Sequence, residues 1–138
     1  MTDPPSGYPP PIAAELRDGA TLDLRALAEE ICSRYRSEFP DEHERYGDAG
    51  VAWCLHDNQH ILTWAVTEAN GYGGLERQLA WLAGVLEARE FPLERLARDL
   101  EIAAEVLEAR PPPERVVAEP LTEGARFVRS RPSFLGAA

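Results

Sequence analysis

Apolar residues recur at steps of three and four along most of this chain, and prolines and glycines interrupt the pattern at helix-length intervals. Such spacing places the apolar side chains on one face of an α-helix. Proline and glycine end helices, because proline lacks the backbone donor and glycine is conformationally permissive. The interruptions fall at Pro40, at 70–74, at Pro92 and at 111–113. The pattern therefore predicts four main helices between residues 21 and 110.

The second of these helices is the most apolar and is expected to be central. It follows an acidic start that Gly47 and Gly50 weaken, and from Val51 onward it is apolar around more than half its circumference. The third helix is expected around 75–86, and the fourth around 93–107 with a near-heptad seam. No segment alternates with period two for long enough to predict a strand. We therefore expect an all-α fold, a single four-helix-type bundle with antiparallel neighbours.

The ends of the chain are richer in proline than its middle. Residues 1–20 contain five of the prolines and are predicted to form a flexible, extended arm. The bundle domain is predicted over 21–110. Residues 111–138 are predicted to be a disordered or extended tail, with one short helix around Leu121 to Val128.

Charge and composition exclude several classes of protein. The 138 residues suit one domain, and 14 basic against 24 acidic residues give a formal net charge of -10. All the basic residues are arginine, a usage typical of GC-rich bacterial genes. An acidic surface repels phosphate backbones, so a nucleic-acid partner is not expected. No run approaches the ~20 apolar residues of a membrane span, and no signal peptide is visible, which favours a cytoplasmic protein without membrane contact. Cys32 and Cys54 are expected to be small buried hydrophobes.

A polar cluster interrupts the central apolar helix at residues 56–60. His56 and His60 are four apart, so their side chains share a helix face roughly 6 Å apart and could clamp a metal ion. Asp57 and His60 are three apart, like the carboxylate–histidine step of di-iron bundles. The metal candidates are therefore His56, Asp57 and His60. A hydrogen-bonded Asp57–His60 pair that ties helices together is the alternative.

Three tryptophans suggest either a pocket or an aromatic core. Trp53 and Trp64 are eleven residues apart, which is three helical turns, so they share a side with Asp57 and His60. Trp81 lies on the next helix. Aromatic walls around a few polar groups are typical of a small-molecule pocket, and they are equally typical of a buried core. The candidate ligand-binding residues are Trp53, Asp57, His60, Trp64 and Trp81.

A series of residues between 31 and 107 carries a family resemblance. It comprises Tyr35-Arg36, Phe39-Pro40, Arg45-Tyr46-Gly47, Trp53-Cys54, Asp57-Asn58, His60, Trp81-Leu82, Val85-Leu86, Arg89, Pro92, Leu96 and Leu100. The series resembles the helical-bundle modules found upstream of cobalamin-binding or signalling domains in bacterial sensor proteins. The resemblance implies a sensory bundle with cobalamin or another tetrapyrrole as candidate cofactor. The Asp-x-His-x-x-Gly motif of the cobalamin domain is not present, since the glycine in 41–47 comes one place late.

These observations leave three functions open. The first is a non-enzymatic sensory or regulatory module that binds a small ligand or a partner protein between its helices. The second is a metal-binding enzyme or storage protein, in which Glu29, Glu30 or Glu68 would add carboxylate ligands to the cluster at 56–60. The third is a structural acidic adaptor or homodimer, with Trp53 and Trp64 packed into the core or against a second subunit.

Overall fold

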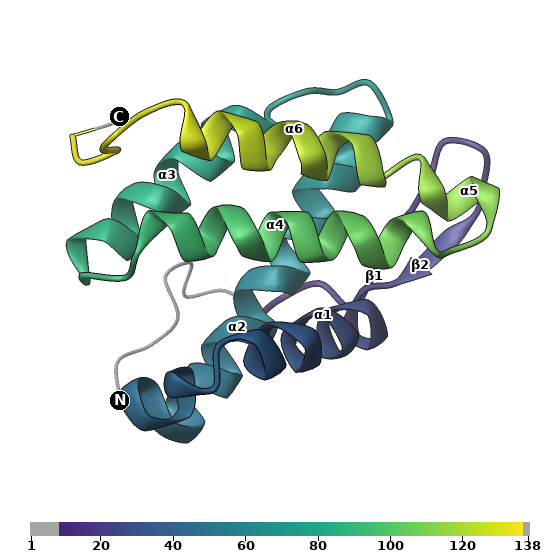
Figure 1. Cartoon of the computed structure of the whole chain (residues 1–138). Coiled ribbons are helices and arrows are strands. Elements are labelled where there is room, and N and C mark those ends of the chain that lie inside the picture. Colours follow the sequence, from purple (N-terminus) through teal and green to yellow (C-terminus); the bar gives the residue numbers. More distant parts are fainter. Residues whose placement is uncertain (1–8, 137–138) are drawn as a thin grey trace.

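A computed structural model of the chain describes residues 9–136 and is predominantly helical (Figure 1). Its elements are β1 (Ala13–Glu15), β2 (Thr21–Asp23), α1 (Leu24–Glu38), α2 (Asp41–Ala69), α3 (Leu75–Ala88), α4 (Leu93–Glu108), α5 (Pro112–Arg115) and α6 (Ala118–Arg129). The predicted helical class is confirmed, and each of the four main predicted helices is present as α1 to α4. Among residues 9–136, no helix is long and apolar enough to cross a membrane.

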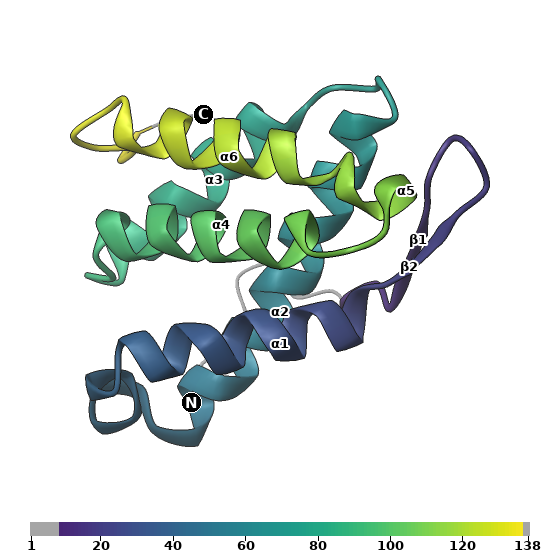
Figure 2. The ribbon, with the colours of Figure 1, turned by 45° about the vertical axis from the view of Figure 1, so that its right-hand side comes forward.

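Two groups of helices pack across a shared core. Helices α4 and α6 lie side by side and run in opposite directions, and they form the most extensive contact between elements (Figures 1 and 2). Helix α1 packs below α4 and against α2, which crosses behind α4. Helix α3 joins the α4–α6 side through contacts with α6. The core between these groups is built mainly of leucine, isoleucine, valine and alanine.

Helix α6 confirms the short helix predicted around Leu121 to Val128, and its burial corrects the prediction that this segment is part of a tail outside the bundle. Leu121, Ala125 and Val128 are buried at steps of three and four, and Gly124 lets the helix approach α3 closely. A Cβ atom at Gly124 would lie 2.8 Å from Leu79 Cδ1. A helix of 12 residues is marginal by itself, so packing on α4 supplies most of its stability. The core therefore extends beyond residue 110, and α6 belongs to it together with α1 to α4.

A short β-hairpin corrects the prediction of a strand-free chain with a flexible arm up to residue 20. Strand β1 pairs antiparallel with β2, with Ala14 opposite Leu22. Each strand has three residues, too few for a period-two pattern to be visible in the sequence. Asn70 at the end of α2 holds the hairpin, because its side chain accepts from the Arg17 amide at 2.8 Å and donates to the Glu15 carbonyl at 3.0 Å. The part of the predicted arm at residues 1–8 lies outside the described residues.

Helix α2 contains a break at Gly47 that shapes the site. Gly47 has φ 61° and ψ −154°, a combination that is essentially restricted to glycine. The six residues before it form a separate turn of helix, which folds back toward α4. The weak early part that the glycines predicted is thus a sharp bend, and the long apolar segment of α2 begins after it.

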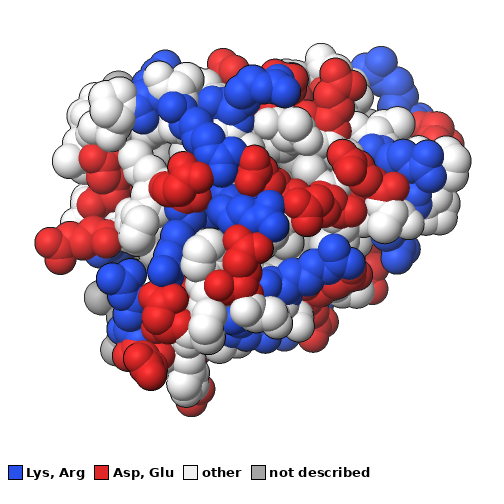
Figure 3. All heavy atoms as spheres, viewed as in Figure 1, with Lys and Arg blue, Asp and Glu red and all other residues white. Residues whose placement is uncertain are grey.

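Ion pairs cross the surface between helices. Arg98 on α4 contacts Glu38 on α1 at 2.7 Å, and Arg129 on α6 contacts Glu94 and Glu101 on α4 at 2.7 and 2.6 Å. Figure 3 shows arginine and acidic side chains interspersed over this face. Exposed pairs of this kind contribute little each, about 0–1 kcal/mol. The apolar core therefore supplies most of the stability of the fold.

Candidate functional site

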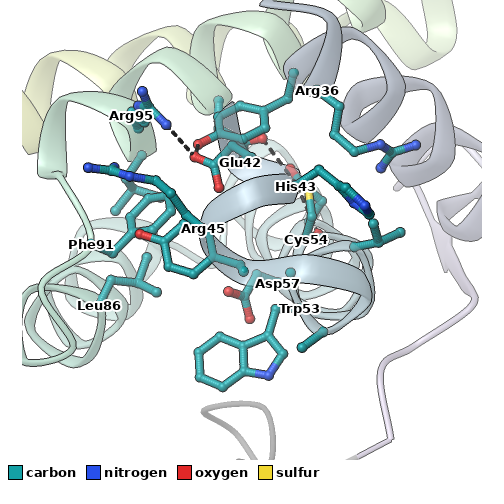
Figure 4. A pocket seen from close by; sticks show the side chains of 18 of the residues that line it. Arg36, Glu42, His43, Arg45, Trp53, Cys54, Asp57, Leu86, Phe91 and Arg95 are labelled. Carbon is teal, nitrogen blue, oxygen red and sulfur yellow. Dashed lines mark hydrogen bonds and ion pairs between the residues drawn. The ribbon is translucent and has the colours of Figure 1, made fainter. Parts of the chain in front are cut away.

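A cavity of about 520 Å³ lies where α1, both parts of α2 and α4 meet the C-terminal end of α3 (Figure 4). Most of its wall is apolar or aromatic, and its size falls in the range typical of small-molecule sites. Trp53 and Asp57 project toward the same space as Leu86 and Phe91 in Figure 4. The residues that line the cavity include Tyr35, Glu42, Tyr46, Trp53, Cys54, Asp57, Asn58, Leu86, Arg89, Phe91, Arg95 and Asp99.

The bend at Gly47 places Glu42 over the cavity, where a cation neutralises it. Arg95 Nη1 donates to Glu42 Oε1 at 2.8 Å, and its other nitrogen contacts Asp41 at 3.0 Å. The Tyr35 hydroxyl also donates to Glu42 Oε1, so the carboxylate is bound from α1 and α4 together. The Arg95 guanidinium lies 4.5 Å from the centre of the Phe39 ring. This cluster closes one side of the cavity and connects three helices.

One turn further along α4, the wall contains a buried carboxyl group without an ion-pair partner among the described residues. Asp99 on α4 is 7% exposed, and it forms no ion pair with any residue between 9 and 136. Burial raises the pKa of Asp99 to about 7, assisted by the nearby charges of Asp57 and Glu42 and opposed by a hydrogen bond from Asn58. The Asn58 amide nitrogen donates to Asp99 Oδ1 at 3.2 Å and to the Cys54 carbonyl at 3.0 Å. Near neutral pH, Asp99 is therefore present in both its protonated and its ionised form.

Asn58 itself has an unsatisfied acceptor. Its Oδ1 atom is buried and finds no hydrogen-bond partner among the described residues 9–136. Leaving such a group unsatisfied costs about 1–3 kcal/mol. Native proteins rarely bury such a group without a hydrogen-bond partner. A buried polar atom that lacks a partner within the protein therefore commonly marks a site for water, an ion or a ligand.

Asp57 adds a second, partly buried carboxyl group to the wall, with its side chain 15% exposed. Burial raises its pKa, and a hydrogen bond and charge from His56 oppose this shift together with the charges of His60 and Arg89. His56 Nδ1 lies 3.2 Å from Asp57 Oδ1. The Arg89 guanidinium lies 4.2 Å from the centre of the Trp53 ring, so the aromatic wall near Asp57 is covered by a cation on one face.

The two cysteines lie together beside this polar wall. Their sulfur atoms are 3.5 Å (Cys32) and 3.4 Å (Cys54) from the Asn58 amide nitrogen. A hydrogen bond with Cys32, burial and the nearby charge of Asp99 hold the pKa of Cys54 well above its usual range. A thiol in this state is a poor nucleophile, because the thiolate is the reactive form. The prediction that Cys32 is a small buried group is confirmed, and Cys54 lines the cavity half-buried.

The structure separates the predicted ligand-binding residues. Trp53 and Asp57 line the cavity, whereas His60, Trp64 and Trp81 are not part of its wall. The His60 ring lies 6.1 Å from the Trp64 ring on another part of α2, and Trp81 on α3 is 41% exposed. Trp53 and Trp64 do share a side of α2, but eleven residues correspond to roughly 16 Å along the helix axis. Their roles in binding remain predictions.

The metal candidates lie close together without forming a metal cage. The rings of His56 and His60 are 4.6 Å apart, and His56 contacts Asp57. Within residues 9–136, however, no three His, Cys, Asp or Glu side chains converge in a way that could hold a metal ion. Glu29 and Glu30 are exposed and form ion pairs with Arg25 and Arg34 on their own helix.

Asp99 was missed by the sequence analysis although a signal for it exists. It lies three residues after Leu96 and four before Ala103, so a carboxyl group occupies the apolar stripe of α4. A charged residue on a buried helix face is rare enough to mark a candidate site.

Comparisons with protein-family models, with curated proteins and with solved structures find no match for this chain. Inference about its function therefore depends on the geometry of the cavity.

Proposed function

We propose that this chain is a non-enzymatic sensory or regulatory module of a bacterial cytoplasm, which binds a small organic ligand in the cavity between α1, α2 and α4. The observation that carries the proposal is the cavity itself, about 520 Å³ of largely apolar space with Asp99 and Asn58 buried in its wall. Convergence of a few polar groups in an apolar cavity is the usual composition of ligand sites. The polar groups fix the orientation of a ligand, and the apolar walls provide affinity.

The surroundings of the cavity favour binding over catalysis. The lining thiol of Cys54 is held protonated, and Glu42 is neutralised by Arg95. Neither arrangement activates a nucleophile, which would need an adjacent base or a lowered pKa. The alternative of a purely structural adaptor accounts for Trp53 and Trp64, which pack against the core, but it does not account for the cavity that Trp53 also lines.

A tetrapyrrole fits the cavity less well than a metabolite does. Of the three histidines, His43 lines the cavity, and it is exposed at the rim. His56 and His60 lie outside the wall, so the described residues offer no buried imidazole to a metal in a large flat ring. We therefore derive no role for cobalamin here, and we expect the purified protein to show no corrin or haem absorption.

A neutral dye tests the proposal. N-phenyl-1-naphthylamine fluoresces in apolar surroundings and can be excited by energy transfer from tryptophan. We expect Trp53→Phe to reduce this transfer more than Trp81→Phe does, because Trp53 lines the cavity. Val51→Phe places a larger side chain in the cavity and should weaken dye binding, whereas Ala52→Phe, at the next and exposed position of α2, should not. Absence of dye binding, or equal binding by both phenylalanine variants at 51 and 52, would contradict the proposal.

A further inference from the structure

The part of the cavity wall around Asp99 is rich in hydrogen-bond acceptors. Asp99 and Asp57 supply carboxyl oxygens, and Asn58 supplies a buried amide oxygen that is unpartnered among residues 9–136. Among residues 9–136, the one hydrogen-bond donor to Asp99 is the Asn58 amide nitrogen at 3.2 Å, which also donates to the Cys54 carbonyl at 3.0 Å. Acceptors thus outnumber the donors that face them, and the wall has spare capacity for donors from a ligand.

The arginines around the cavity do not supply these donors. Arg95, one turn before Asp99 on α4, is occupied by Asp41 and Glu42. Arg89 lies over the Trp53 ring at 4.2 Å. Arg45 pairs with Asp41 at 3.7 Å. The guanidinium of Arg36, whose buried Nη1 has no partner among residues 9–136, points away from Asp57 and Trp53 in Figure 4. No ion pair joins an arginine to Asp57 or Asp99 within the part of the chain that the structure describes.

The apolar part of the wall suits an organic cation as well. Tyr46 and Phe91 lie with their ring centres 6.0 Å apart, and Trp53 faces the same space. Aromatic faces attract cations through their quadrupole, and they also pack against apolar groups. The formal net charge of -10 adds a long-range attraction for positively charged ligands.

We propose that the cavity selects an organic amine in its protonated form, with the ammonium group against Asp99, Asp57 and Asn58 and an apolar or aromatic body against Trp53 and Phe91. A primary ammonium carries three donors, which matches the three acceptor groups of the wall. It would satisfy the orphaned amide oxygen and neutralise a buried carboxylate at once. A carboxylate or phosphate ligand would meet the same wall with like charge and no donors. This inference rests on the proposed ligand-binding function and specifies its ligand class.

The test uses three probes of similar size that differ in charge. 2-Phenylethylamine, 2-phenylethanol and 3-phenylpropanoate compete with N-phenyl-1-naphthylamine at pH 8, and 4-phenylbutylamine extends the amine series for length. We expect an amine to displace the dye at concentrations at least about tenfold below those of the alcohol and the acid. Hydrogen bonds to charged groups support a preference of roughly ten- to a hundred-fold. Asp99→Asn should remove most of this preference, while the neutral dye still binds.

Two variants keep the result interpretable. Asp57→Asn should also weaken amine binding. This variant tests the inference independently if Asp99→Asn fails to fold. Asp48→Asn removes the same charge from an exposed position beside the cavity, so it should leave the preference intact. If the dye binds but the acid or alcohol competes as well as the amines, the amine inference is overturned and the cavity proposal stands. An amine preference that survives both substitutions at 57 and 99 also overturns it. Failure of the dye itself to bind contradicts the proposed function.

Discussion

Replacing Asp99 by asparagine should stabilise the fold, by an amount that grows with pH. The folded protein holds the pKa of Asp99 at about 7, against an ordinary value of 3.8. An unfolded chain releases this proton near pH 4, and the folded chain releases it near pH 7. Between these values the folded state binds more protons, so the free energy of unfolding falls as pH rises. At about 1.4 kcal/mol per pH unit, the loss from pH 4 to pH 7 amounts to about 4 kcal/mol.

Asparagine keeps the shape of the side chain and cannot ionise, so it removes this loss. The difference in unfolding free energy between Asp99→Asn and the parent should therefore rise by up to about 4 kcal/mol between pH 4 and pH 8 and stay flat above pH 8. Urea denaturation at a series of pH values measures it, and subtraction of the parent curve cancels the other titrating groups. The groups that face Asp99 are Tyr35, Glu42, Cys54, Asp57 and Asn58. If the difference in unfolding free energy between Asp99→Asn and the parent does not change with pH, the conclusion that Asp99 is buried in its neutral form is refuted.

Further perturbations test other parts of the account. Arg95→Leu leaves a buried carboxylate without its cation and should lower the unfolding free energy by about 2–3 kcal/mol in urea denaturation, whereas Arg45→Leu, in an exposed pair, should lower it by less than about 0.5 kcal/mol. Gly47→Ala should cost about 1–3 kcal/mol in the same assay, because φ 61° with ψ −154° suits glycine; a neutral effect would argue against the bend. Leu121→Ala should cost about 2–5 kcal/mol if α6 belongs to the core, against little for the exposed Leu135→Ala. Affinity for 2-phenylethylamine should fall from pH 8 to pH 5 as Asp99 takes up a proton, and a calorimetric titration showing constant affinity would contradict this coupling.

The helices were predictable because their signals are local. The stripe from Leu24 to Tyr35 and the stop at Pro40 predicted α1, and the apolar segment after Val51 predicted the long part of α2. Helix α6 was harder, since its stripe is short and its stability depends on packing against α4. The β-hairpin left no signal at all, because Asn70 holds it from the far end of α2 through contacts between residues over fifty positions apart.

The site was only partly predictable because it depends on how helices meet. The polar cluster at 56–60 was visible, but its members point to different surroundings. Asp57 and Asn58 line the cavity, whereas Gln59 donates to the Pro11 carbonyl at 2.9 Å and holds the N-terminal segment. Sequence spacing showed that Trp53 and Trp64 share a side of one helix. Which of the two tryptophans lines the cavity depends on where along α2 the helices α1 and α4 pack.

The most direct test of the central claim is a nuclear magnetic resonance titration of the three tryptophan indole signals, assigned by single phenylalanine substitutions. With 2-phenylethylamine as the probe, the account predicts that the Trp53 signal shifts in a saturable way, because this residue lines the cavity. The exposed Trp81 signal should stay in place. A saturable shift of Trp81 with Trp53 unmoved would contradict a ligand site between α1, α2 and α4, as would the absence of any shift with the amine and with the neutral dye.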